Sequence, residues 1–358
     1  MHILNKLDFY FFVASFILTL TFIFILFPVG FKLGLVDMPG GRKRHGQIVP
    51  LIGGIAIFLS VSLLLSCTQV DMPILAYWLA SFLLICVCII DDKINLSPKM
   101  RFIAQSMAIL IIIFFGDGVI VSLGNMLSIK PLYLGVFSIP FTLFAIIGVI
   151  NAVNMTDGLD GLTGSVSIVE SLMLLVLAIE VRAQQEIYIL LSLIGGLLAF
   201  LFFNFPNGFL KKYRVFLGDS GSMFIGLTLA WACVRLTQNS SGYPAVLMLW
   251  VMALPIMDTI YLIINRKARG VSPFKSDTRH MHHILQRYFS KTQTVIIMSF
   301  SSFFVGITGL IFYWNGVSEQ LMFYMYIVIF VLYCVLSTYL RNRLFIRKNK
   351  VKNLSIVG

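Results

Sequence analysis

Acidic, amide and histidine side chains gather in four short segments of a chain that is otherwise strongly apolar. They are Asp91 and Asp92; Asn151, Asn154, Asp157 and Asp160; Asp219; and Asp277, His280, His282 and His283. Carboxylate and amide oxygens are hard ligands, and Mg²⁺ usually takes one or two carboxylates together with phosphate oxygens. A metal ion, several acids and cations for phosphate suit phosphoryl transfer, because its catalysis is mostly positioning and charge neutralisation.

The stretch VFLGDSGS, residues 215–222, indicates how a phosphate would be held. Gly218 and Gly221 let backbone N–H groups approach an oxyanion closely, and the start of the following helix adds a positive end. Asp219 would supply the carboxylate ligand of a divalent ion.

Other residues near these segments complete a phosphate site. Asn154 precedes Asp157 by three residues, about one helical turn, so both side chains can face the same cavity. Cations for phosphate are offered by Lys43, Arg44, Lys99, Arg101, Arg266 and Arg279.

Each segment has an ordinary structural interpretation when it is taken alone. Two acids at a helix end can be a solvated terminus, an Asp-Gly stretch can be a turn, and an Asp before a helix can be a cap. The sequence HMHH, residues 280–283, can lie at the membrane interface. It can also bind zinc, which we disfavour because no cysteine or second ligand cluster accompanies it. Together the four segments favour a functional site, because acids near a membrane are costly and usually functional.

The elements that must position these residues are membrane helices. The chain has 358 residues, of which 59% are hydrophobic and 12% charged, whereas soluble proteins carry about 25% charged residues. The net charge is +12, and the basic residues lie between the apolar spans. This placement favours anionic lipid or phosphate ligands and argues against nucleic acid.

A spanning helix needs about 20 mostly apolar residues, and the hydropathy pattern predicts eleven such spans. They cover residues 9–30, 51–67, 73–90, 102–122, 135–153, 163–181, 186–204, 220–236, 243–264, 294–314 and 320–340. The expected fold class is therefore all-α, a polytopic integral membrane protein with about eleven transmembrane helices.

The basic residues predict the orientation of these spans. Of the 27 lysines and arginines, 23 lie on one side of the predicted membrane, in the loops that follow the first, third, fifth, seventh and ninth spans and in the C-terminal tail. Because this excess marks the cytoplasmic side, we predict an N-terminus outside and a C-terminus in the cytoplasm. All four polar segments then lie on the cytoplasmic side.

Five motifs occur in an order that resembles the polyprenyl-phosphate N-acetylhexosamine-1-phosphate transferases, and the resemblance covers nearly the whole chain. They are GLVDMPGGRKRHGQIVPLIGG (34–54), DDKINLSPKMR (91–101), NAVNMTDGLDGL (151–162), VFLGDSGS (215–222) and SPFKSDTRHMHH (272–283). Members that begin peptidoglycan synthesis have three adjacent histidines, whereas Met281 stands between His280 and His282 here. This departure argues against a UDP-muramoyl-pentapeptide donor.

The resemblance implies one transmembrane transferase domain over residues 1–358 in the bacterial inner membrane, with its active site facing the cytoplasm. The catalytic loops would be residues 31–50, 91–101, 154–163, 205–219 and 265–293. The implied reaction moves N-acetylglucosamine 1-phosphate from UDP-N-acetylglucosamine to undecaprenyl phosphate and releases UMP, with Mg²⁺ or Mn²⁺ as cofactor. It would begin O-antigen, enterobacterial common antigen or a related cell-envelope polysaccharide.

The same resemblance implies roles for individual residues. Asp219 and Asn154 would be the metal ligands. The catalytic residues would be Asp91, Asp92, Asp157, Asp160, His280, His282 and His283. The substrate-binding residues would be Lys43, Arg44, Lys99, Asn151, Asn154, Arg266, Asp277 and Arg279.

Several alternatives stay open at the level of sequence. The donor can be another UDP-N-acetylhexosamine, and the chain can be a homodimer in contact with membrane lipid. A transporter of nucleotide sugar or lipid-linked sugar, or a non-catalytic scaffold, would share the membrane spans. Transporters tend to place acids near the bilayer midplane, whereas the acids here crowd at span ends. Asp258, about two turns from the end of its span, either joins the site or makes a packing hydrogen bond.

Overall fold

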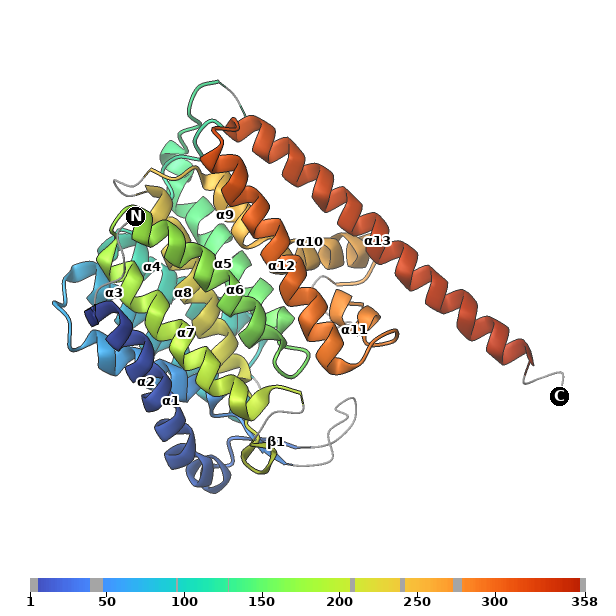
Figure 1. Cartoon of the computed structure of the whole chain (residues 1–358), viewed down its shortest axis with the longest axis horizontal. Helices are drawn as coiled ribbons and strands as arrows, with labels where there is room; N and C mark the ends of the chain where they lie inside the picture. The colour runs from blue at the N-terminus through green and yellow to red at the C-terminus, as the bar shows by residue number, and fades with distance from the viewer. Residues whose placement is uncertain are drawn as a thin grey trace.

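The computed structural model shows a bundle of helices and confirms the all-α, polytopic class (Figure 1). It describes residues 6–38, 48–94, 96–127, 129–206, 210–238, 242–272 and 279–354. Within these residues the only paired strands are β1 (Val36–Asp37) and β2 (Val49–Pro50), which are antiparallel with Val36 opposite Pro50.

Thirteen α-helices and two short 3₁₀ helices make up the described part of the chain. The α-helices are α1 (Lys6–Leu33), α2 (Gly53–Leu65), α3 (Met72–Ile94), α4 (Pro98–Phe115), α5 (Ser138–Thr156), α6 (Leu162–Glu180), α7 (Gln184–Asn204), α8 (Gly218–Gln238), α9 (Ala245–Val251), α10 (Ala253–Lys267), α11 (Met281–Leu285), α12 (Lys291–Trp314) and α13 (Glu319–Leu354). The 3₁₀ helices are η1 (Gly135–Phe137) and η2 (Lys211–Tyr213).

Each of the eleven predicted spans has a helical counterpart, but two of them differ in form. In the described residues nine helices are long and apolar enough to cross a membrane, or ten spans if the bent pair α9 and α10 is one. The span predicted at 51–67 is the 13-residue helix α2, which is short for a full crossing. The span predicted at 243–264 is α9 followed by α10, bent by 84° at Met252.

Proline explains the break between α9 and α10. Pro255 lies in the first turn of α10. Its ring would clash with the carbonyl of Val251, four residues earlier, and it has no N–H to donate. Val251 is the last residue of α9, so the break falls where a continuous helix would meet this clash.

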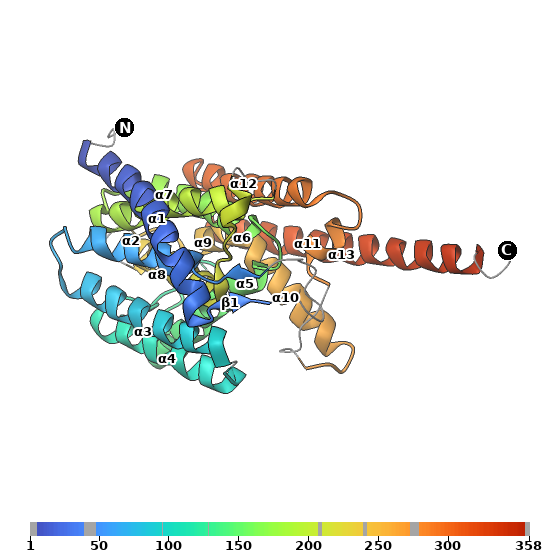
Figure 2. The ribbon, with the colours of Figure 1, turned by 90° about the horizontal axis from the view of Figure 1, so that it is seen from below.

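Helix α8 lies inside the bundle, where it packs against α5, α3, α2 and α6 (Figure 2). It is the least apolar of the nine candidate spans, yet the largest share of it is buried. Its polar side chains are therefore covered by protein rather than lipid. Helices α1 and α13 are at the periphery and expose many large apolar side chains, and α13 projects well beyond the bundle (Figure 1).

Two glycines allow α2 to pack closely on the start of α8. A Cβ at Gly54 would lie 2.0 Å from the Cα of Gly221 and 2.4 Å from its backbone nitrogen. The backbone nitrogens of Gly53 and Gly54 donate to the carbonyls of Phe216 and Leu217, at 2.9 and 3.1 Å. The segment that carries Asp219 is thus held by backbone contacts with α2.

We expect Gly54→Ala to separate α2 from α8, because the clash is with backbone rather than with a flexible side chain. The expected cost is about 1–3 kcal/mol of stability, typical of overpacking, and a lowered Tm in detergent will show it. Gly148→Ala in α5 is the matched control, because a Cβ there meets nothing within 4 Å. A Tm for Gly54→Ala equal to that of Gly148→Ala would contradict the close-packing argument.

Candidate active site

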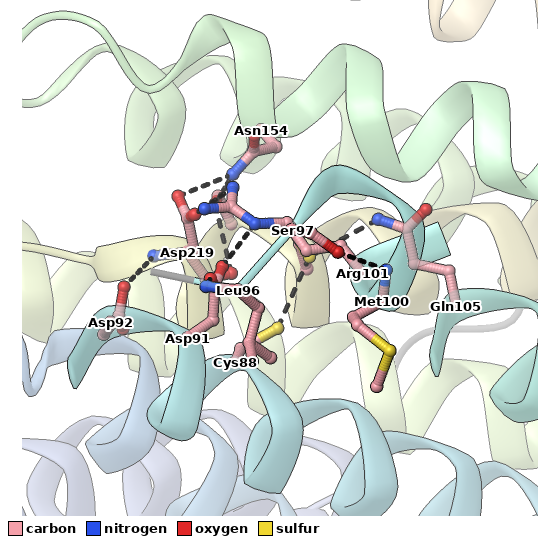
Figure 3. Close-up of polar contacts among 12 residues, drawn as sticks. Cys88, Asp91, Asp92, Leu96, Ser97, Met100, Arg101, Gln105, Asn154 and Asp219 are labelled. Atoms are coloured by element: carbon pink, nitrogen blue, oxygen red, sulfur yellow. Dashed lines mark hydrogen bonds and ion pairs between the residues drawn. The ribbon is translucent and has the colours of Figure 1, made fainter. Parts of the chain in front are cut away.

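Two carboxylates from distant segments meet at one arginine (Figure 3). Arg101, in the first turn of α4, pairs its Nε with Oδ2 of Asp91 at 2.6 Å and its Nη1 with Oδ2 of Asp219 at 2.9 Å. Asp91 is buried at the end of α3 and accepts from the backbone nitrogen of Leu96 at 2.6 Å. Arg101 therefore joins the end of α3 to the start of α8.

Asp92 lies against the first residues of α8. Its Oδ1 accepts from the backbone nitrogen of Asp219 at 3.4 Å. Gly218 has a φ of +74°, and a Cβ there would lie 3.0 Å from Oδ2 of Asp92. Glycine is needed at this position both for the left-handed backbone and for the approach of Asp92.

Asn154 approaches Asp219 from α5, as Figure 3 shows. Its Nδ2 donates to Oδ1 of Asp219 at 3.1 Å and to Oγ of Ser222 at 2.8 Å. One turn earlier, Nδ2 of Asn151 donates to Oε1 of Gln105 in α4 at 3.0 Å. The two asparagines thus share one face of α5 but have different partners.

The junction between α5 and α6 holds the next two acids. Asp157 directly follows α5, is exposed, and accepts a hydrogen bond from Oγ1 of Thr163 at 3.1 Å. Asp160 is half-buried and forms an ion pair with Arg214, with Nζ of Lys291 at 3.7 Å from the same oxygen. Asp160 is therefore bound by protein cations, whereas Asp157 stays accessible.

The histidine segment lies against this junction. A Cβ at Gly158 would be 2.3 Å from Nε2 of His282, so that ring contacts the turn directly. Its ring centroid is 5.2 Å from that of His280 and 4.2 Å from that of His283. Burial, followed by the nearby His283 and His280, lowers the pKa of His282 well below its usual range. His282 is therefore neutral near pH 7 and suits hydrogen bonding better than charge pairing with phosphate.

The remaining predicted substrate-binding residues lie in several environments. Lys99 is exposed, and it points away from Arg101 because two residues along a helix turn the side chain by about 200°. Arg266 is buried at the end of α10, and Nη1 of Arg279 donates to Oδ1 of Asn265 at 3.3 Å. Lys43, Arg44 and Asp277 lie outside the described residues.

The cluster at the start of α8 fits a divalent cation. Asp91, Asp92 and Asp219 bring three carboxylates together, while Arg101 supplies one positive charge to two of them. The donors are oxygens, as Mg²⁺ and Mn²⁺ prefer. Asn154 turns its amide nitrogen toward Asp219, so its oxygen would reach a shared ion only after the amide turns over.

Sequence reasoning gave no role to two side chains that hold this site together. Ser222, one turn after Asp219, is buried and accepts a hydrogen bond from Asn154. Its spacing of three residues from Asp219, which places both side chains on one face of α8, is the sequence signal that could have identified it. Arg214 pairs with Asp160 and lies 4.9 Å from the ring centroid of Phe216. No local pattern links Arg214 to residue 160, because 54 positions separate them.

Comparison with known proteins shows which proteins this chain is similar to. A family model described as glycosyl transferase family 4 matches residues 74–237. The chain is 37% identical over 322 residues to the undecaprenyl-phosphate alpha-N-acetylglucosaminyl 1-phosphate transferase of Pasteurella multocida, covering 87% of this chain and 89% of that protein. It is 36% identical over 317 residues to the protein of the same name from Haemophilus influenzae, covering 86% and 88%. For the Salmonella typhi protein of that name the identity is 32% over 327 residues, covering 90% and 88%.

Proposed function

Because the chain belongs to glycosyl transferase family 4, the polyprenyl-phosphate N-acetylhexosamine-1-phosphate transferases, we propose that its donor is UDP-N-acetylglucosamine and its acceptor is undecaprenyl phosphate. The relatives named for this reaction cover about nine-tenths of the chain at 31–37% identity, which supports the choice of sugar and lipid. Transfer of N-acetylglucosamine 1-phosphate would begin a cell-envelope polysaccharide such as O-antigen or enterobacterial common antigen.

One observation carries the proposal. Arg101 bridges Asp91 and Asp219, and Asn154 meets the same Asp219, so three segments far apart in the sequence meet at one end of α8. A diphosphate and a divalent ion need this convergence of acids, amides and a cation. A scaffold would not need it.

The proposed chemistry is a substitution at phosphorus. An oxygen of undecaprenyl phosphate bonds to the β-phosphorus of the donor, the bond from that phosphorus to the bridging oxygen breaks, and UMP leaves with its electron pair. A phosphate monoester has its second pKa near 6, so the acceptor is already largely a dianion at pH 7. A general base then contributes little, which favours direct attack over a covalent aspartyl intermediate.

The divalent ion, held by Asp219 with Asn154 or Asp92, would neutralise charge on the diphosphate. Arg101 already lies between Asp91 and Asp219, where it can exchange a carboxylate for a phosphate oxygen. Asp157 would face the nucleotide from the α5–α6 junction, and His282 and His283 would donate hydrogen bonds to the sugar or phosphates. The positive-inside bias supports placing this site on the cytoplasmic side of a bacterial inner membrane.

A lipid-transfer assay tests the proposal. Purified chain receives UDP-N-acetylglucosamine labelled in the sugar, undecaprenyl phosphate and Mg²⁺, with parallel reactions containing other UDP-hexosamines. We expect label in the lipid phase and an equal amount of UMP, with N-acetylglucosamine preferred. Uptake of intact donor into proteoliposomes without release of UMP would indicate a transporter. The absence of both lipid labelling and donor uptake would indicate a scaffold.

We expect Asp91→Asn to lower kcat by about 10–100-fold while leaving measurable turnover. The amide keeps an oxygen for the backbone nitrogen of Leu96 but loses the ion pair with Arg101. An interaction with a charged group is worth about 1.5–3 kcal/mol, which sets the range. UMP release measures it, and Asp71→Asn, an acid at the other end of α3, is the control. Complete inactivity, or an unchanged rate, would refute the positioning role of Asp91.

A further inference from the structure

Asp258 binds the histidine segment from a buried position in α10. Its Oδ2 is 2.8 Å from Nδ1 of His280, and its Oδ1 accepts from the backbone nitrogen of Met281 at 3.1 Å. The same Oδ1 accepts from the hydroxyl of Tyr333, in α13, at 2.6 Å. The carboxylate therefore joins α10, the start of α11 and the C-terminal helix, although none of its partners belongs to the Asp219 cluster.

A metal ion is the competing explanation, because one ligand atom from each of Asp258, His280 and His282 lies within 4.8 Å of the others. A metal binds an imidazole nitrogen along its lone pair, in the plane of the ring. The rings of His280 and His282 are stacked, with an interplanar angle of 24°, so one ion does not lie easily in both planes. Both oxygens of Asp258 already have donors, which favours a hydrogen-bonded network.

This network fixes the chemistry of His280. A carboxylate only accepts, so Nδ1 of His280 must carry the proton in this bond, and Nε2 is left for a ligand. In metal sites and in catalysis, such a partner sets both the tautomer and the ring orientation of a histidine.

Ring contacts link the orientation of His280 to the α5–α6 junction. His280 stacks on His282, and His282 contacts Gly158 at the α5–α6 junction. Tyr333 and Asp258 are thus linked through two histidine rings to the turn that carries Asp157.

We propose that Asp258 and Tyr333 are positioning residues, which set the tautomer and orientation of His280 and thereby shape the side of the proposed active site that would receive the donor. The inference rests on the proposed function for the identity of that donor. It gives the C-terminal helix a part in catalysis that its peripheral place in the bundle does not suggest.

Two tyrosines make a matched pair for the test. Tyr261 also lies at the contact of α10 with α13, and its ring is 6.2 Å from that of Tyr333. Its hydroxyl, however, bonds with Oγ1 of Thr338 at 3.3 Å and not with Asp258. We expect Tyr333→Phe to lower kcat/KM for UDP-N-acetylglucosamine about tenfold, mainly through KM, consistent with losing one hydrogen bond to a charged group. Tyr261→Phe should stay within about twofold, and neither variant should change the KM for undecaprenyl phosphate.

The double variant separates positioning from simple stabilisation. If Tyr333 acts through Asp258, then Asp258→Asn should cost about 100-fold in kcat/KM for the donor, and adding Tyr333→Phe should cost nothing more. Equal effects of Tyr333→Phe and Tyr261→Phe, or additive effects of Tyr333→Phe and Asp258→Asn, would overturn the proposal.

Ring-nitrogen NMR of ¹⁵N-histidine protein gives a readout that does not need turnover. The His280 signal, assigned by its loss in His280→Gln, should show a protonated Nδ1 in the wild type, and the proton should move to Nε2 in Asp258→Asn. If the wild-type protein transferred no sugar phosphate to the lipid, the proposed function would be rejected but the positioning role would not. A His280 tautomer that Asp258→Asn leaves unchanged would reject the positioning role, whatever the donor.

Discussion

Asp219→Ala is expected to reduce UMP release by at least about a thousandfold. Asp219 contacts both Arg101 and Asn154 and is the carboxylate on which the proposed cation site depends. A catalytic metal ion is worth several kcal/mol, and each 1.36 kcal/mol is a factor of ten in rate. The fold should survive the substitution of Asp219, because Arg101 keeps its ion pair with Asp91 and Asn154 keeps its hydrogen bond with Ser222.

A titration with Mg²⁺ distinguishes loss of the metal site from loss of structure. Asp219→Ala should show no activation at any Mg²⁺ concentration, while its Tm stays within a few degrees of the wild type. Asp219→Asn, which keeps one oxygen, should need much more Mg²⁺ for its residual turnover. An Asp219→Ala variant with the wild-type activation curve would show that the ion is held elsewhere.

The helices and the gathering of polar segments could be predicted from sequence because both are local properties. Apolar runs of membrane length identify helices, and polar residues at the ends of such runs must leave the lipid. The forms of α2 and α9–α10 were harder to predict. Pro255 breaks a helix, whereas Pro28 lies inside the continuous helix α1, so a proline alone does not fix a bend.

The partners within the site could not be predicted, because they depend on how distant segments pack. Lys99 and Arg101 both qualified as phosphate cations by charge, yet only Arg101 faces Asp91 and Asp219. The difference is the direction of each side chain around α4, which becomes decisive only when the neighbours of that helix are known. The partner of Asp160 could not be predicted either, because Arg214 lies in a loop far along the chain.

Gly158→Ala is the second substitution for which we expect a large effect. A Cβ at this position would lie 2.3 Å from Nε2 and 2.9 Å from Cε1 of His282. The ring cannot withdraw easily, because it is buried between His280 and His283. Gly158 does not have a positive φ, so the backbone accepts alanine and the strain falls on the histidine segment.

The displaced ring should lower kcat/KM for the donor about 100-fold, since a shift of about 1 Å at a reacting site can cost that much. UMP release at varied UDP-N-acetylglucosamine measures the loss, and Gly148→Ala, on the open face of α5, is the control. In a His282→Ala background the clash disappears, so Gly158→Ala should then have no further effect. If Gly158→Ala were as active as Gly148→Ala, or if it were equally damaging without the His282 ring, contact between this turn and the histidine segment would not matter for catalysis. The expected pattern instead ties the requirement for glycine at 158 to a single imidazole more than 100 residues away in sequence.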